Sequence, residues 1–301
     1  MTDPTSQIRG AFSAIFTPFD ENNEVNYDML HQIANFQMDH GVRGFFVCGS
    51  TGEGLLMTEE ERQRVVASMV EIASGRATVI AHVGHPRTET SIKLAKRAAD
   101  DGADWIASVA PIYHGTTFDG AMRHYQAISS ATDLPFMVYS LGGVIEPLRD
   151  AAFFELPNVC GLKYTGSSFF SVQQLMRRVD RPVALMSGFD EQFVASLSFG
   201  FHGGIGSTFN FAPQFYSGIY NAYHRGQIEE AAQLQSKINT VTDLMIQYEN
   251  WSYRKAIMKY LGFDCGAARL PYAPLTDQEF ADYCRRLDAL EVLKTKESTA
   301  V

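Results

Sequence analysis

The stretch GFFVCGSTGEGLLMTEEERQRVVASMVEIASGRATVIAHVG, residues 44–84, holds two short apolar runs separated by a segment with helical periodicity. The runs at 44–49 and 78–84 have the length and apolar content of buried strands. Between them, Thr58 and Glu61 have the spacing of a capping box, which predicts a helix from Thr58 to Ile72. The order strand, helix, strand is typical of a βαβ unit in a parallel sheet.

The same alternation continues along most of the chain, with further helices predicted from Tyr27 to Asp39 and from Thr88 to Ala99. Eight β-α units without a Pro/Ser-rich linker favour an α/β fold of the (β/α)8 TIM barrel type. A doubly wound sheet is the alternative. The expected strands are residues 11–17, 44–49, 78–84, 105–111, 135–140, 159–165, 182–188 and 203–208.

After the eighth strand, residues 211 to 293 show helical patterns only, including helices expected at 227–247 and 251–261. This is more helix than one closing β-α unit requires. We therefore expect a (β/α)8 barrel over residues 1–225 and a helical C-terminal extension over residues 226–301 that packs on the barrel.

The charge and composition restrict the class of partner. A net charge of -9 disfavours nucleic acid and anionic membrane surfaces as partners, which leaves small molecules. The N-terminus has no apolar signal segment and no run of about 18 apolar residues occurs, so we expect a cytoplasmic protein. Four widely spaced cysteines without a CxxC motif predict reduced thiols.

Lys163 stands in the middle of the apolar run VCGLKYT, whereas the other seven lysines fall in predicted helices or in the C-terminal tail. Every strand of a closed barrel is central, so an edge position does not explain a lysine there. Side chains alternate along a strand, so Lys163 shares a face with Gly161 and Thr165, opposite Leu162 and Tyr164. An inward lysine near the C-terminal end of a barrel strand lies where catalytic residues of this fold collect.

A buried lysine can be neutral near pH 7, and a neutral amine forms a Schiff base with a ketone. The protonated imine then accepts electrons from a neighbouring carbon–carbon bond, as aldol cleavage requires. We expect a covalent imine on Lys163 and no metal or other cofactor. The reaction also needs an anchor for a carboxylate or phosphate, a proton shuttle, and groups that hold the departing aldehyde.

Candidates for the carboxylate anchor and for the proton shuttle follow strands two and five. Ser50 and Thr51 lie between glycines in CGSTGEG, which indicates either a small nest for a carboxylate or an ordinary βα turn with hydroxyl caps. Tyr139 ends strand five, where it is either a proton relay or a buried core residue.

Strands seven and eight supply candidates for the aldehyde side. Asp190 and Glu191 precede a helix, as caps do, and two adjacent acids also suit sugar hydroxyls. Ser207 ends the glycine-rich strand eight. His82 and His85 offer a metal-dependent alternative, but two histidines without nearby acids make a weak site.

The chain contains five short motifs, each at the end of a predicted strand, and they occur in the same order as in a known family. Through them the chain, from about residue 7 to 290, resembles the dihydrodipicolinate synthase and N-acetylneuraminate lyase superfamily of class I aldolases. The resemblance implies that Lys163 forms the Schiff base, that Tyr139 is the acid/base residue, and that Ser50 with Thr51 holds the pyruvate carboxylate. The motifs are GSTGE at 49–53, Tyr139, GLKYT at 161–165, GFDE at 188–191 and GGIGSTFN at 203–210.

The resemblance also implies roles on the sugar side and at a subunit boundary. Tyr113 matches a family tyrosine that reaches into a neighbouring subunit's site, so we count it with Ser50 among the catalytic residues. Members of the superfamily are commonly tetramers, which implies a homotetramer here. The residues implied to face the sugar-derived part of the substrate are Thr165, Gly188, Asp190, Glu191 and Ser207.

The chain departs from the family pattern after Tyr139, where Ser140 to Gly143 replaces the usual Asn, aliphatic residue and Pro, and at Ala110, where Thr is frequent. The expected activity is reversible cleavage of N-acetylneuraminate to pyruvate and N-acetylmannosamine. Alternatives are another 2-keto-3-deoxy sugar acid aldolase, a dihydrodipicolinate synthase, or a non-catalytic keto-acid-binding barrel. Ser50, and the absence of an arginine between Tyr139 and Arg149, disfavour the synthase.

Overall fold

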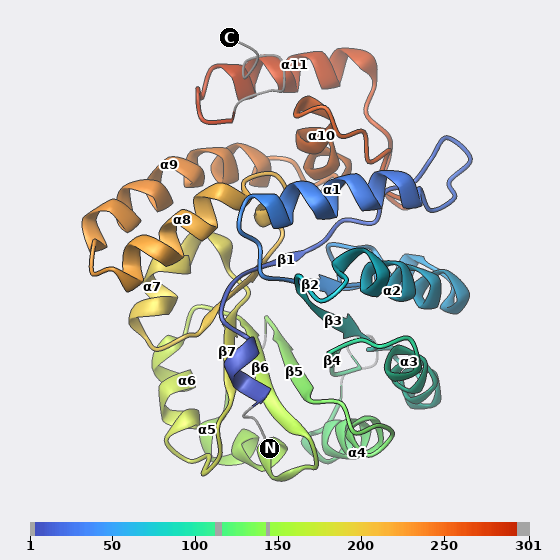
Figure 1. Ribbon diagram of the computed structural model, residues 1–301, viewed down its shortest axis with the longest axis vertical. Helices are drawn as coiled ribbons and strands as arrows, with labels where there is room; N and C mark the ends of the chain where they lie inside the picture. The colour runs from blue at the N-terminus through green and yellow to red at the C-terminus, as the bar shows by residue number, and fades with distance from the viewer. Residues whose placement is uncertain (1–3, 112–115, 143–144, 294–301) are drawn as a thin grey trace.

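The computed structural model describes residues 4–111, 116–142 and 145–293, and within them eight parallel strands close into a barrel in the order β1 to β8 (Figure 1). The (β/α)8 fold predicted from the alternating pattern is confirmed. The strands are β1 (Gly10–Ala14), β2 (Gly44–Val47), β3 (Thr78–His82), β4 (Trp105–Val109), β5 (Phe136–Leu141), β6 (Val159–Thr165), β7 (Ala184–Ser187) and β8 (Gly203–Gly206).

The helices surround the barrel, and the three predicted in the first half of the chain are present. In α2 (Glu59–Ala73), Thr58 is the N-cap and forms the predicted capping box with Glu61. The other helices are α1 (Tyr27–Asp39), α3 (Thr88–Asp100), α4 (Phe118–Ser129), α5 (Pro147–Asp150), α6 (Phe169–Met176), α7 (Phe193–Ser198), α8 (Pro213–His224), α9 (Ile228–Ile246), α10 (Ser252–Tyr260) and α11 (Asp277–Asp288). Short 3-10 turns include η1 (Pro4–Gln7), η2 (Gly54–Leu56), η3 (Ala151–Glu155), η4 (Asp190–Gln192) and η5 (Thr208–Asn210).

Large side chains fill the barrel interior, so the barrel is a packed core. Phe12, Phe46, Trp105 and Met186 are fully buried in one inner cluster. The outward-facing Leu162 belongs to a second cluster between the strands and the helices. Alternation along each strand separates the two clusters, as a barrel with helices on its outer surface requires.

The last helices pack on one side of the barrel. In Figure 1, α9 runs along α8, while α10 lies between α1 and α11. The Phe263 ring, which follows α10, lies 4.8 Å from the Phe36 ring of α1. The chain turns between α8 and α9 at Gly226, which has a φ of +77°, and we propose this turn as the boundary between residues 1–225 and 226–301. Across the part of the chain that the structure describes, no helix is both long and apolar enough to cross a membrane.

Candidate active site

Lys163 lies on the inner face of β6, near the C-terminal end of the barrel, and is 5% exposed. Its Nζ lies 4.1 Å from the centre of the Phe46 ring and 4.3 Å from that of Tyr139. No described residue forms an ion pair or a hydrogen bond with this ammonium group. Burial lowers the pKa of Lys163 to about 7, and the charge of Asp190 opposes this shift. A large fraction of the amine is therefore neutral at physiological pH.

Lys255 on α10 provides a contrast, since it is the other buried lysine of the described chain. Its Nζ lies 2.6 Å from Oε1 of Glu53, and both side chains are almost fully buried. Burial lowers the pKa of Lys255, but the carboxylate of Glu53 opposes the effect. Its charge is thus matched by a direct partner, whereas the Lys163 amine faces aromatic rings.

Tyr139 lies beside Lys163, because the two residues are paired in the register of β5 and β6. Burial raises the pKa of the Tyr139 phenol, while the hydroxyls of Thr165 and Ser50 lower it. Thr165 Oγ1 is buried and forms no well-aligned hydrogen bond with any described residue, yet it lies close enough to affect the phenol. An amine, a phenol and two hydroxyls therefore meet at one place.

The GSTGE segment forms a tight turn after β2. The Glu53 N–H donates to the Ser50 carbonyl at 3.1 Å, and the Gly54 N–H donates to the Gly49 carbonyl at 3.0 Å. A Cβ on Gly54 would lie 1.9 Å from the Cys48 carbonyl oxygen, so a side chain cannot be accommodated there. Ser50 is exposed at the mouth of the barrel, and the neighbouring Thr51 is buried.

Asp190, at the start of η4, is buried and joins the ends of β7 and β8. Its Oδ2 accepts hydrogen bonds from the Thr208 N–H and hydroxyl, both at 2.8 Å, and from the Ser207 hydroxyl at 3.3 Å. Burial raises the pKa of Asp190, against the effect of these donors and of Lys163. Its Oδ1 lies against Gly206, where an added Cβ would lie 2.2 Å from this oxygen.

The other predicted residues of the sugar side lie nearby. Gly188 is close to Thr165, since a Cβ on Gly188 would lie 1.9 Å from Thr165 Oγ1, and only glycine fits this approach. Glu191 is exposed, and its pKa is raised by partial burial and by the charge of Asp190. Its main-chain carbonyl accepts a hydrogen bond from Asn239 Nδ2 of α9 at 3.1 Å. Tyr113 and Gly143 lie outside the described residues.

The histidine pair does not present a metal site. His82 is buried, its Nδ1 donates to the Cys48 carbonyl at 3.2 Å, and its Nε2 accepts from the Val109 N–H at 3.3 Å. Both ring nitrogens are thus engaged with the main chain. Burial, together with the nearby Arg62 charge, lowers the pKa of His82 to about 3. His85 Nδ1 accepts from the Arg87 N–H, so His82 and His85 act as structural residues here.

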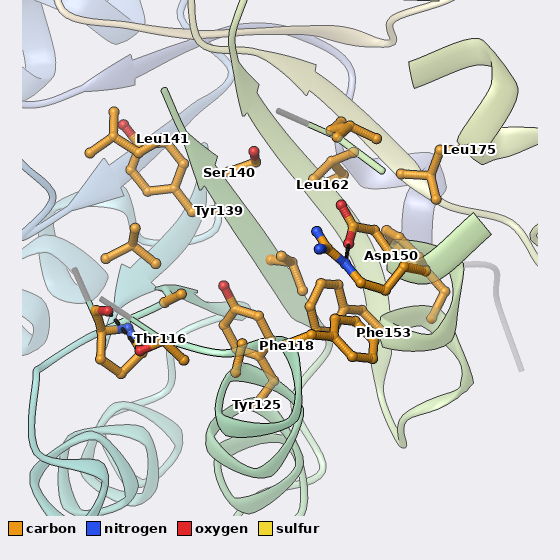
Figure 2. A pocket seen from close by; sticks show the side chains of 18 of the residues that line it. Thr116, Phe118, Tyr125, Tyr139, Ser140, Leu141, Asp150, Phe153, Leu162 and Leu175 are labelled. Carbon is orange, nitrogen blue, oxygen red and sulfur yellow. Dashed lines mark hydrogen bonds and ion pairs between the residues drawn. The ribbon is translucent and has the colours of Figure 1, made fainter. Parts of the chain in front are cut away.

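Two cavities adjoin the altered segment after Tyr139. A cavity of about 230 Å³ at the mouth is lined by Ser50, Leu141, Trp251 and Tyr272, among others. A second cavity, of about 340 Å³, lies against α4 and reaches outward-facing residues such as Leu162 (Figure 2). Leu141 lines both. Ser140, which stands where the family usually has Asn, lines the second cavity, so the departure from the family pattern changes a wall of that cavity.

Three residues that support the site were not predicted from the sequence. Thr208 holds Asp190, as described above. Asn210 donates to the Ala14 carbonyl at 2.7 Å and accepts from the Phe16 N–H at 3.0 Å, which fastens the end of β8 to β1. Lys255 pairs with Glu53. The only sequence signal was the place of Thr208 and Asn210 within GGIGSTFN and of Glu53 within GSTGE.

The chain is similar to known proteins in sequence and in fold. N-acetylneuraminate lyase of Citrobacter koseri is 35% identical over 277 residues, which cover 90% of this chain and 93% of that protein. The structure of N-acetylneuraminate lyase from Mycoplasma synoviae matches with a TM-score of 0.88 and 29% identity, covering 96% of this chain and 99% of that chain. A dihydrodipicolinate synthase of Bacillus anthracis also matches with a TM-score of 0.88, at 25% identity, covering 95% of this chain and 99% of that chain.

The two solved structures carry different activities on one barrel, so the fold alone does not select the substrate. The sequence profile of the Dihydrodipicolinate synthetase family matches residues 7–290, a range that includes all five strand-end motifs. The chain belongs to the Dihydrodipicolinate synthetase family.

Proposed function

We propose that the chain is a Schiff-base, class I, pyruvate-dependent aldolase that reversibly cleaves N-acetylneuraminate to pyruvate and N-acetylmannosamine. The observation that carries this proposal is a buried, unpaired Lys163 whose pKa is about 7, with the Tyr139 phenol beside it. The 35% identity to N-acetylneuraminate lyase supports the choice of substrate. Ser140, in place of the usual Asn, supports a second candidate, another 2-keto-3-deoxy sugar acid, because it alters the loop after Tyr139 that the substrate borders.

The geometry supports the following sequence of steps. Neutral Lys163 attacks the keto carbon of the open-chain sugar acid, and the Tyr139 phenol gives its proton to the hydroxyl that leaves as water, which gives a protonated imine and a phenolate. The Tyr139 phenolate then accepts the proton of the C4 hydroxyl as the C3–C4 bond breaks, and the bonding electrons move into the imine to form an enamine. Protonation of the enamine at C3 and hydrolysis of the imine release pyruvate and free the lysine. The imine supplies the electron sink, so the proposal needs no metal or other cofactor.

Pyruvate release from N-acetylneuraminate, followed with lactate dehydrogenase and NADH, tests the proposed activity. We expect turnover of N-acetylneuraminate, weaker turnover of 2-keto-3-deoxygluconate, and no condensation of pyruvate with aspartate semialdehyde. A preference for the shorter keto-deoxy acid would favour the second candidate, and rapid condensation with the semialdehyde would favour a synthase.

The rate of pyruvate trapping by borohydride should depend on pH through Lys163. Because only the neutral amine attacks, the rate should rise as pH increases through about 7 and then level off. The Asp190 charge raises the pKa of Lys163, so Asp190→Asn should move this limb to lower pH. If the trapping rate of the wild type instead rises near pH 10, the range of an ordinary lysine, the lowered pKa of Lys163 is contradicted.

Glu191→Ala tests whether the acids recognise the sugar. A site built to pair with hydroxyls loses much of its selectivity when a partner is removed, so we expect at least about a tenfold loss in kcat/KM for N-acetylneuraminate. Pyruvate trapping on Lys163 should stay nearly unchanged, because Glu191 would touch only the aldehyde half. Asp190→Ala should also lower kcat/KM for N-acetylneuraminate, with the pH limb of trapping moved to lower pH as in Asp190→Asn, and with added loss of stability, since Asp190 also holds Thr208. Normal cleavage by Glu191→Ala would assign this acid a capping role.

Further properties follow from the same proposal. We propose a homotetramer in the cytoplasm, with small-molecule partners and with Tyr113 completing the site of a neighbouring subunit. Light scattering during size-exclusion chromatography should give four times the chain mass. Tyr113→Phe should lower kcat without changing this mass, and a fully active monomer would exclude a shared site.

A further inference from the structure

The turn that carries Ser50 and Thr51 contacts the C-terminal region of the chain through Glu53. Glu53, the last residue of the GSTGE motif, has a φ of 56° and is 3% exposed. Its Oε1 lies 2.6 Å from Lys255 Nζ of α10, and its Oε2 accepts a hydrogen bond from the Arg269 N–H at 2.7 Å. Two segments of the C-terminal region therefore hold one carboxylate of the turn.

The contacts of Glu53 fix the turn as a unit. The Glu53 N–H donates to the Ser50 carbonyl, and the hydroxyl of Thr17, after β1, donates to the Gly52 carbonyl at 2.7 Å. The residues that present hydroxyls and N–H groups to the mouth thus lie between two anchored points. A shift of Glu53 moves Ser50 and Thr51 with it.

A second contact holds the far side of the same segment. The Arg269 guanidinium pairs with Glu61 of α2, with contacts of 2.8 and 2.5 Å, and donates to the Leu56 carbonyl at 3.1 Å. The ring of Phe19 lies under both cations, 4.2 Å from Lys255 Nζ and 4.1 Å from the Arg269 guanidinium carbon. The C-terminal region therefore contacts the segment from Glu53 to Glu61 at both of its ends.

A buried ion pair is a weak source of stability, because desolvation of both charges offsets their attraction. The positions of the two charged groups, by contrast, are restricted. The Lys255 ammonium group also donates to the Ala267 carbonyl at 3.2 Å, so it must stay where it reaches both Glu53 and Ala267. Such a pair is well suited to fix the position of a loop.

We propose that Lys255 is a positioning residue for the carboxylate site: through Glu53 it holds Ser50 and Thr51 where they receive the carboxylate of the keto acid. The inference rests on the proposed function and extends it to the C-terminal region. Lys255 acts through Glu53, whereas Lys163 performs the covalent step. Loss of Lys255 should therefore weaken binding of the keto acid and leave the reactivity of the Lys163 amine in place.

Lys255→Met keeps the apolar stem and removes the charge. The apparent affinity for pyruvate, measured from the concentration dependence of borohydride trapping on Lys163, should fall on the order of 10- to 100-fold, the scale of a site displaced by about 1 Å. KM for N-acetylneuraminate should rise more than kcat falls. The pH limb of trapping should stay at the wild-type position, which a general loss of structure would not predict.

Lys259→Met is the matched control, since Lys259 lies one turn further along α10 and pairs with Asp264 in solvent. Its affinity for pyruvate should equal that of the wild type. The double variant Glu53→Gln/Lys255→Met removes both charges with little change in volume. We expect it to recover thermal stability relative to Lys255→Met while pyruvate affinity stays low, because the tether is still missing.

The possible results distinguish a failure of this inference from a failure of the proposed function. If the wild-type protein gains no pyruvate adduct, the proposed function itself is contradicted. A labelled wild type with unchanged affinity in Lys255→Met overturns the positioning role. Recovery of affinity together with stability in the double variant also overturns it, because the defect would then come from an unpaired buried charge. If Lys255→Met does not fold, the affinity of the double variant alone decides between the two accounts.

Discussion

Lys163→Arg is expected to abolish both turnover and pyruvate trapping. The guanidinium remains protonated at any pH at which the protein is folded, so it has no free electron pair to attack a ketone. Lys163 is distinctive because burial lowers its pKa to about 7 while no carboxylate pairs with it directly. Arginine places a permanent charge where the lysine amine is in large part neutral, so a loss of activity is assigned to the missing nucleophile only in a variant that folds.

The measurement is pyruvate release from N-acetylneuraminate, together with the intact mass after borohydride. Lys259→Arg serves as the control, because Lys259 is an exposed lysine on α10, and it should behave like the wild type. Circular dichroism should show that both variants keep the helical content of the barrel. Turnover by a folded Lys163→Arg protein above about a thousandth of the wild-type rate would place the imine elsewhere, since loss of the covalent nucleophile removes most of the rate enhancement.

Tyr139→Phe is expected to lower kcat by roughly 10²-fold or more, the scale for loss of a positioned proton-transfer group. The hydroxyl is the part of the side chain that meets Thr165 and Ser50. The ring, which lies 4.3 Å from Lys163 Nζ and packs edge-on against Phe46, is retained by phenylalanine. Folding should therefore survive, and the lowered pKa of Lys163 should persist.

Thermal unfolding and single-turnover trapping separate these effects. We expect a melting temperature close to that of the wild type and a pyruvate adduct that still forms on Lys163. The steps that slow are the proton transfers during loss of water and during cleavage of the carbon–carbon bond, so the adduct forms more slowly than in the wild type. Turnover of Tyr139→Phe at nearly the wild-type rate would mean that another group moves the proton.

Much of the fold could be predicted because period-2 and period-3.6 patterns are local properties of the sequence. The helix Tyr27–Asp39 has the predicted bounds, and the Thr58 cap sets the start of α2 as expected. Six of the eight strands are shorter than the apolar runs that predict them, whereas β5 and β6 are as long as their runs. The run 203–208, for example, gives a strand that ends at Gly206, because Ser207 and Thr208 turn to meet Asp190.

The site could be predicted in part for the same reason. Alternation along β6 puts Lys163 and Thr165 on one face without any knowledge of the other strands. Contacts between strand ends require the closed barrel, so the bond from Thr208 to Asp190 could not be inferred from pattern. The pair of Glu53 and Lys255 joins segments at opposite ends of the chain, and no local periodicity signals such a contact.

The central claim is that Lys163 forms an imine with pyruvate, and reductive trapping tests it most directly. The protein is incubated with pyruvate and borohydride, its intact mass is recorded, and peptides are mapped to locate the adduct. A chelator is included in a parallel reaction. The account predicts one pyruvate-derived adduct per chain, on Lys163, with or without the chelator. An adduct on another lysine, no adduct at all, or activity that is lost to the chelator and restored by zinc would contradict it.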